Sequence, residues 1–220
     1  MDGAKPKPRR ALPRGINALP KQEVEREQRA RLAEGLTAAL TEKGYAAVSV
    51  ADVLAKAGVS RRTFYQLFAD KEDCFLAAYE ESAGRLAAAV AAAYADDERP
   101  WPERVARGVE MALDFLAADP PRASLLLVEV LGAGPRALDR RERVLASLAV
   151  MFADAPVDDP TRQLLTEAVV GGLYELAYAR VVKGEARALR SAKRDFLYVA
   201  LVPFLGHEGA SAHVDSAVSD

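Results

Sequence analysis

Five side chains within one short run carry hydrogen-bond donors in a pattern that suits recognition of a polyanion. The run is RRTFYQ, and it supplies Arg61, Arg62, Thr63, Tyr65 and Gln66. Arginine and glutamine pair with base edges in the major groove of DNA, while threonine and tyrosine hydroxyls bind phosphate oxygens. The surrounding residues offer these donors no obvious partner inside a domain. A DNA duplex is therefore the first ligand that their chemistry indicates.

Two short helices joined by a tight turn are predicted to position these donors. Ser49-x-x-Asp52 is a capping box at the start of the first helix. Gly58 is predicted to end that helix, and Ser60 to cap the second, which runs over about residues 61–68. This is the size of a helix-turn-helix DNA reader, although a plain amphipathic hairpin with a charged outer face is the alternative. The apolar stripe of the second helix comprises Phe64, Leu67 and Phe68.

The run GVSRRTFYQLFADKEDCF, together with the capping box before it, closely resembles the N-terminal domain of TetR-type transcriptional regulators. The resemblance covers about residues 21–79, and the remaining chain matches that family only in length and all-helical character. It implies that the helix beginning near Ser60 reads the major groove. It also implies that the residues matching Ser49 and Tyr65 touch phosphates, and that the lysine matching Lys71 caps the contact from the next helix.

Carried over by position, the resemblance gives eight DNA-contact residues and two departures from the family pattern. Arg62 stands where a glycine is frequent, and Leu67 stands where a histidine is frequent. We therefore expect no DNA contact from position 67 and an added basic group at position 62. The predicted DNA-binding residues are Ser49, Ser60, Arg61, Arg62, Thr63, Tyr65, Gln66 and Lys71.

The charge of the chain is divided between its two ends. Residues 1–71 hold 14 Lys and Arg against 8 Asp and Glu, whereas residues 72–220 hold 16 against 24. Polyanion binding depends on local positive charge, so the net charge of −2 does not argue against DNA. Residues 1–20 are predicted to be a disordered basic arm that follows phosphates or enters a minor groove. A solvated tail that aids solubility is the alternative.

Composition excludes several other classes of protein. No apolar run approaches the ~20 residues that cross a bilayer, and no signal peptide is recognisable, so we expect a cytoplasmic protein without a membrane partner. Cys74 is the only cysteine and is expected to pack inside a helix. His207 and His213 lie far along the chain without a nucleophile or metal cluster beside them, and no phosphate-binding loop occurs. No catalytic residue, metal site or cofactor is therefore predicted.

Proline and glycine signals divide the chain into nine predicted helices and no strand, an all-α fold. The predicted organisation is the arm, a three-helix DNA-binding domain over residues 21–71, a helical effector-binding and dimerisation domain over 72–206, and a flexible tail over 207–220. Prolines mark four of the helix starts because proline is tolerated in the first turn. The predicted helices cover about 21–43, 50–57, 61–68, 71–95, 102–118, 120–131, 135–153, 160–183 and 187–205.

Two apolar surfaces near the C-terminus are predicted to form a homodimer. The eighth helix contains Gly171 and Gly172, where two backbones can approach closely. In the TetR family the last two long helices make the dimer, which the resemblance implies here as a four-helix seam. The alternative is that both surfaces face the core of the same chain. The predicted interface residues are Leu165, Val169, Gly172, Leu176, Phe196, Ala200 and Phe204.

Aromatic and sulfur-containing side chains scattered through the fourth to eighth helices predict an apolar effector site. Broad apolar faces mixed with hydroxyl or indole donors are the usual composition of small-molecule pockets, although aromatics at helical spacing are more often core. The predicted ligand-binding residues are Tyr94, Trp101, Met111, Phe115, Phe152, Tyr174 and Tyr178.

The sequence thus predicts a ligand-responsive DNA-binding transcriptional regulator. We expect a repressor that binds a palindromic double-stranded DNA operator as a homodimer and is released by a small apolar effector. The alternatives are an architectural or ligand-independent DNA-binding protein, which would not need so large a second domain, and an all-α enzyme, for which the chain offers no chemistry.

Overall fold

Helices follow one another along the whole described chain, and no strand occurs within residues 21–95 and 98–219, which this computed structural model describes. The predicted basic arm, residues 1–20, lies outside them. η1 is a π-helix, and η2 and η3 are 3-10 helices. The bounds are α1 (Lys21–Ala47), α2 (Val50–Ala57), α3 (Arg61–Leu67), α4 (Lys71–Tyr94), α5 (Trp101–Ala118), α6 (Pro120–Ser124), η1 (Leu125–Glu129), α7 (Val130–Gly132), α8 (Pro135–Leu148), η2 (Ala149–Phe152), α9 (Asp159–Val182), η3 (Ala186–Ala192) and α10 (Lys193–Ser219).

The ends of α2 and α3 are fixed by the residues that the sequence indicated. The Ser49 side chain accepts from the Asp52 amide, and the Asp52 carboxylate accepts from the Ser49 amide at 2.9 Å, so the capping box is confirmed. Gly58 has φ 63° and ends α2, as predicted. The Ser60 side chain accepts from the Thr63 amide at 3.0 Å and begins α3. These local contacts set the angle at which α3 leaves the turn.

Gly35 allows α1 and α2 to pack closely. A Cβ atom built on Gly35 would lie 2.8 Å from both the amide nitrogen and the Cβ of Ala57, closer than real Cβ contacts come. Gly35 is buried, and Leu32 and Leu36 beside it are fully buried. The close approach of the two helices therefore requires glycine at this position.

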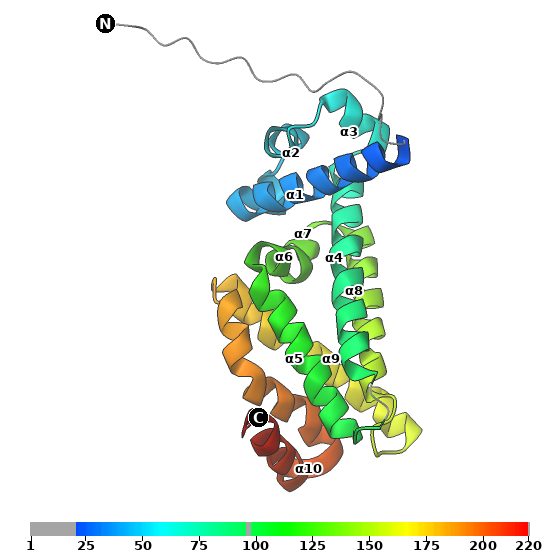
Figure 1. The fold of residues 1–220 in the computed structure, drawn as a ribbon, viewed down its shortest axis with the longest axis vertical. Coiled ribbons are helices and arrows are strands. Elements are labelled where there is room, and N and C mark those ends of the chain that lie inside the picture. The colour runs from blue at the N-terminus through cyan, green and yellow to red at the C-terminus, as the bar shows by residue number, and fades with distance from the viewer. Residues whose placement is uncertain (1–20, 96–97, 220) are drawn as a thin grey trace, which may run out of the picture.

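α4 joins the two ends of an elongated molecule (Figure 1). In Figure 1, α1, α2 and α3 lie at one end, α4 runs down from them with α8 alongside it, and α5, α9 and α10 fill the other end. Asp70 caps α4 by accepting from the Asp73 amide at 2.8 Å. A displacement of α4 would therefore act on both ends.

An aromatic cluster closes the core at the end farthest from α3. The Trp101 and Phe204 ring centroids lie 5.5 Å apart, and the Phe152 and Phe204 rings stack at 5.4 Å. Trp101 Nε1 donates to the Met151 carbonyl at 2.9 Å. The buried residues of the described chain form one cluster from Leu32 to Val214, so the predicted division between domains 21–71 and 72–206 stays a prediction.

The all-α fold class is confirmed, and each of the nine predicted helices has a counterpart in the described residues. The predicted helix over 120–131 is formed by α6, η1 and α7 in succession. Its π-helical turn was not predicted, because nothing in the local sequence signals it. Within the described ranges, no helix is both long enough and apolar enough to span a membrane.

Residues 207–219 differ from the flexible tail that the sequence suggested. Gly206 has φ 69° and ψ 178°, which breaks α10, and the chain then continues as helix to Ser219. Ala210 is fully buried and Val214 is 2% exposed. The small and polar composition of this segment hid the two apolar positions that hold it against the core.

Candidate nucleic-acid interface and effector cavity

α3 presents its polar side chains to solvent. Arg61, Arg62 and Gln66 are exposed, and Tyr65 is 52% exposed. None of the four has a hydrogen-bond or ion-pair partner among residues 21–95 and 98–219. On the opposite face Phe64 is fully buried, and its ring lies edge-on to that of Tyr65 at 5.3 Å. α3 is thus held by its apolar face while its donors remain available to a ligand.

The hydroxyl groups at the starts of α2 and α3 differ in what they can still bind. Ser60 Oγ lies 2.8 Å from Thr63 Oγ1, a contact that uses one of their two hydroxyl hydrogens and leaves the other available. Ser49 Oγ donates its only hydroxyl hydrogen to Asp52 Oδ2 at 2.7 Å. The Ser60–Thr63 pair can therefore donate to a phosphate without losing an internal contact, whereas Ser49 cannot.

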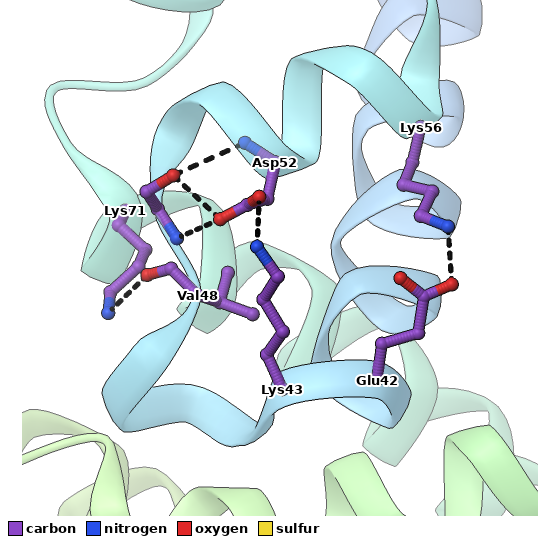
Figure 2. Close-up of polar contacts among 7 residues, drawn as sticks. Glu42, Lys43, Val48, Asp52, Lys56 and Lys71 are labelled. Atoms are coloured by element: carbon purple, nitrogen blue, oxygen red, sulfur yellow. Dashed lines mark hydrogen bonds and ion pairs between the residues drawn. The ribbon is translucent and has the colours of Figure 1, made fainter.

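Lys71 points inward rather than toward the exposed face of α3. Its Nζ donates to the carbonyl oxygens of Tyr45 and Val48 at 2.8 and 2.9 Å, and it lies 4.2 Å from the centroid of the Tyr45 ring. Figure 2 shows the contact with Val48. Lys71 therefore secures the turn between α1 and α2, a role that the resemblance did not indicate, and its phosphate contact stays a prediction.

Two further lysines near the interface are paired with carboxylates (Figure 2). Lys43 Nζ lies 2.5 Å from Asp52 Oδ1, and Lys56 pairs with Glu42. Lys43 and the hydroxyl and amide of Ser49 hold the pKa of the Asp52 carboxyl well below its usual range. These carboxylates offset the positive charges of Lys43 and Lys56. Attraction of phosphates to this end of the molecule therefore depends more on the arginines of α3.

Arg31 fixes the turn between α2 and α3, a role that no local sequence pattern indicates. Arg31 Nη2 donates to the carbonyl oxygens of Ala57 and Gly58 at 2.8 and 3.1 Å. Arg29 lies over the ring of Phe68 at 4.9 Å. Both arginines come from α1, too far along the chain from their partners for any spacing rule to link them.

Helices from α4 onward line an apolar cavity of about 100 Å³. α4, α5, η1, α8 and α9 form its wall, with Met151 from η2 and Phe196 from α10. The side chains that line it are Tyr79, Leu86, Val109, Ala112, Leu113, Leu116, Leu126, Leu127, Arg141, Val144, Leu145, Leu148, Met151, Val170, Leu173, Tyr174, Ala177 and Phe196.

Of the seven predicted ligand-binding residues, only Tyr174 lines this cavity. Trp101 and Phe152 belong to the aromatic cluster, and Tyr94 contacts Asp154 and Arg104 at the end of α4. The remaining three are Met111, which is 37% exposed, Phe115, which lies under Arg122, and Tyr178, which stacks on Tyr174.

Arg141 is the unexpected member of the cavity wall. Its guanidinium carbon lies 4.0 Å from the centroid of the Tyr174 ring, and its Nε is buried without a hydrogen-bond partner. No carboxylate among the residues that the structure describes forms an ion pair with it. Sequence reasoning selected aromatic residues and overlooked Arg141 because a charged residue in the run DRRER suggests a solvated face.

Glu129 connects the cavity wall to the helix-turn-helix end. Gly44 has φ 71° and ψ 163°, which breaks α1 and leaves the Tyr45 amide without a helical acceptor. Glu129 Oε2 accepts from that amide at 2.7 Å. Glu129 is the last residue of η1, and Leu126 and Leu127 of the same π-turn line the cavity. One short segment therefore touches both regions.

Four of the predicted dimer-interface residues are buried in their own chain. Val169 is 3% exposed, and the stripe on α10 packs against the core of its own chain, so these positions offer little surface to a second copy and the dimer interface stays a prediction. Leu165, Gly172 and Leu176 are half-buried. The periodicity of α10 correctly indicated an apolar face but could not distinguish the same chain from a second copy. The buried α10 residues are Phe196, Ala200 and Phe204.

Cys74 packs inside α4, as predicted. It is 1% exposed, and burial raises the pKa of its thiol to about 12. The thiol is therefore neutral at physiological pH and is a poor nucleophile.

The comparisons with known proteins agree with this architecture. The family model for bacterial regulatory proteins of the tetR family matches residues 34–78. FadR of Bacillus subtilis, solved in complex with stearoyl-CoA, has a TM-score of 0.68 and 17% identity over 81% of this chain and 98% of its own. FadR of Bacillus halodurans has a TM-score of 0.70 and 19% identity, over 83% of this chain and 97% of its own.

A third solved structure extends the comparison beyond Bacillus. A TetR-like regulator from Rhodococcus sp. RHA1 gives a TM-score of 0.62 and 20% identity over 84% of this chain and 99% of its own. A search of curated protein sequences gave no match. Residues 34–78 of this chain thus match the tetR family of bacterial regulatory proteins, and the chain as a whole shares its fold with solved TetR-like regulators.

Proposed function

We propose that this protein is a dimeric transcriptional repressor that binds a palindromic operator through α3 and releases it when a small, mainly apolar effector occupies the cavity. The observation that carries the proposal is the α6–η1–α7 segment, which lines the cavity through Leu126 and Leu127 and holds the Tyr45 amide through Glu129. A protein that only bound DNA would not need a cavity connected in this way to its DNA reader.

DNA recognition is assigned to the exposed face of α3. Arg61, Arg62 and Gln66 are long side chains that can reach base edges, and the Ser60–Thr63 pair can donate to a phosphate at the helix start. Tyr65 projects beside them with its hydroxyl available to a phosphate. The absence of internal partners for the three long side chains within the described residues supports this assignment.

Release is assigned to the π-turn. A π-turn inserted in an α-helix is one rearrangement away from regular α-helix, and such turns are frequent at functional sites. A ligand that pushes on Leu126 or Leu127 would favour one arrangement of η1 and thereby move Glu129 relative to Tyr45. The ligand can shift this equilibrium only by its difference in affinity for the two arrangements.

The effector is proposed to be elongated and mainly apolar. Apart from Arg141 and two tyrosines, every side chain on the cavity wall is apolar. The B. subtilis FadR structure contains stearoyl-CoA, whose acyl chain is a ligand of that shape. The cavity volume is about 100 Å³, whereas an engineered protein cavity of about 150 Å³ admits a molecule as small as benzene. We therefore propose that the cavity enlarges as the effector enters.

The dimer is proposed to form through the outer face of α9 rather than through the buried stripe of α10. Leu164 is 67% exposed and Val182 is 55% exposed at the two ends of this face. Between them, a Cβ built on Gly171 or Gly172 would meet nothing within 4 Å, so no contact inside the chain explains two glycines in mid-helix. A second copy packed on α9 supplies such a reason.

Selection of DNA from a random duplex pool tests the central assignment. We expect the full-length protein to enrich a two-fold-symmetric sequence whose half-sites are about one helical turn apart. Arg61→Ala should lose about 1–3 kcal/mol of binding free energy and relax specificity at one base pair of each half-site. Arg107→Ala, an exposed arginine on α5, is the control and should select the wild-type sequence.

Two results would reject the assignment. Enrichment of no sequence would leave an architectural DNA-binding protein, and unchanged selection by Arg61→Ala, Arg62→Ala and Tyr65→Ala would remove α3 from the interface. Repression is tested separately by placing the selected sequence before a reporter gene. Expression should fall when the protein is present, and a rise would indicate an activator.

A further inference from the structure

A surface groove adjoins the apolar cavity and is lined in part by charged and polar side chains. The groove lies between α4 and α8 and has a volume of about 240 Å³. Tyr79 and Val144 line both the cavity and the groove, so these two side chains separate them. The groove wall comprises Tyr79, Glu80, Ala83, Gly84, Ala87, Arg140, Arg143, Val144 and Ser147.

Three arginines of α8 surround this boundary. Arg141 lines the cavity, while Arg140 and Arg143 line the groove. Arg140 is paired with Glu80, and Arg143 Nε donates only to the Asp139 carbonyl of its own helix at 3.3 Å. The described chain thus supplies one carboxylate for three guanidinium groups at the boundary. Arg143 is exposed, but Arg141 is partly buried, and a partly buried guanidinium without a carboxylate partner carries a cost that an anion would remove.

The side of the groove formed by α4 is lined by small residues. Ala83, Gly84 and Ala87 supply no bulk, and a Cβ built on Gly84 would meet nothing within 4 Å. A glycine in mid-helix lowers helix stability by about 1 kcal/mol relative to alanine, and packing inside the chain does not account for this one. The small residues leave room for a head group opposite the arginines.

We infer that the effector is an anionic amphiphile whose apolar chain enters the cavity and whose carboxylate or phosphate binds Arg141 at the boundary with the groove. This inference rests on the proposed function and specifies the class of its ligand. The chain must pass between Tyr79 and Val144, which separate the two spaces. The volume of the cavity alone is smaller than that of drug-sized ligand sites, which is roughly 300–1,000 Å³. The cavity and the groove together reach the lower end of that range.

Calorimetric titration of the full-length protein with matched probes tests the inference. Decanoate and decyl phosphate carry the anion, and decanol presents the same chain without charge. We expect both anionic probes to bind about ten- to one-hundredfold more tightly than decanol, the range of a charge-assisted hydrogen bond. Tighter binding of decanoate would indicate a fatty acid, and tighter binding of decyl phosphate would indicate a phosphate-bearing head group.

Arg141→Met tests the anchor directly. The variant should bind decanoate at least tenfold more weakly and bind decanol unchanged. Its melting temperature should rise, because methionine replaces a charge that has no carboxylate partner with an apolar side chain of similar length. The control Arg187→Met changes an exposed arginine on η3 and should alter neither affinity nor melting temperature.

The outcomes separate this inference from the proposed function. Equal affinities for decanol and decanoate, no binding of either anion, or unchanged decanoate affinity in Arg141→Met would overturn the inference and leave DNA binding by α3 untouched. Failure of the DNA selection would instead reject the proposed function, while the calorimetric result for Arg141 would still stand.

Discussion

Lys71 holds the turn before α2 by binding two backbone carbonyls at once. The Tyr45 and Val48 carbonyls both face its ammonium group. Lys71→Met would remove both contacts while keeping most of the apolar stem. We expect the free energy of unfolding to fall by about 1–2 kcal/mol, discounted from the value of buried charged hydrogen bonds because Lys71 is half-buried. Thermal unfolding of the variant measures this directly.

The salt dependence of operator binding distinguishes this structural role from a phosphate contact. Each phosphate contact contributes about 0.9 to the slope of log K against log salt concentration. We expect Lys71→Met to keep the wild-type slope, and Arg62→Ala, its control on α3, to keep the wild-type melting temperature. A normal melting temperature with a slope reduced by about 0.9 would show that Lys71 contacts DNA, as the family resemblance implies.

The distance along the chain decides which residue roles could be predicted. The caps at Ser49, Gly58 and Ser60 involve partners within a few positions, so the sequence alone indicated them. The contact of Arg31 with Ala57 and that of Glu129 with Tyr45 join residues far apart in the sequence. No rule of spacing identifies such partners without the fold.

At the scale of the element, the α6–η1–α7 segment should carry the coupling between effector and operator. Glu129→Ala removes its contact with the Tyr45 amide but leaves Leu126 and Leu127 on the cavity wall. We expect the variant to bind both operator and effector, with an effector-induced change in operator affinity that falls from the usual 5–150-fold toward one. Operator titrations with and without effector measure this coupling.

Glu142→Ala provides the matched control, because Glu142 is an exposed acid on α8. It should retain the full effector response. If Glu129→Ala also responds like the wild type, the signal passes through another element, and α4 is then the next candidate because it spans from Lys71 to Tyr94.

The helices themselves were predictable because proline, glycine and capping residues act locally. Asp119 caps α6, and α5, α6, α8 and α9 each have proline in their first turn, as the sequence indicated. The partners of the helix faces were not predictable in the same way. The stripe containing Phe196 and Phe204 is equally periodic whether it meets its own core or a second copy, and the structure assigns it to the core.

At the scale of the whole molecule, the outer face of α9 should determine the oligomeric state. We expect Leu164→Glu and Val182→Glu to give monomers by light scattering, because each would bury a charge in the proposed dimer. The monomers should lose most of their affinity for a two-fold-symmetric operator, since only one half-site can be bound at a time.

Val150→Glu is the matched control, because Val150 on η2 is 51% exposed and Val182 is 55% exposed. It should remain a dimer with full operator affinity. A wild-type monomer at micromolar concentration, or a dimer that survives both α9 substitutions, would place the interface elsewhere.

The burial of Val214 in α10 bears on the order in which the protein can fold during synthesis. Chains emerge from the ribosome N-terminus first, so the helix that carries Ala210 and Val214 emerges after α1 to α9. The three helices of the DNA reader and the α4 helix that supports them are complete long before that. We therefore expect the helices that read DNA to leave the ribosome before Glu129 and α10, so that their final packing waits for the segments made after them.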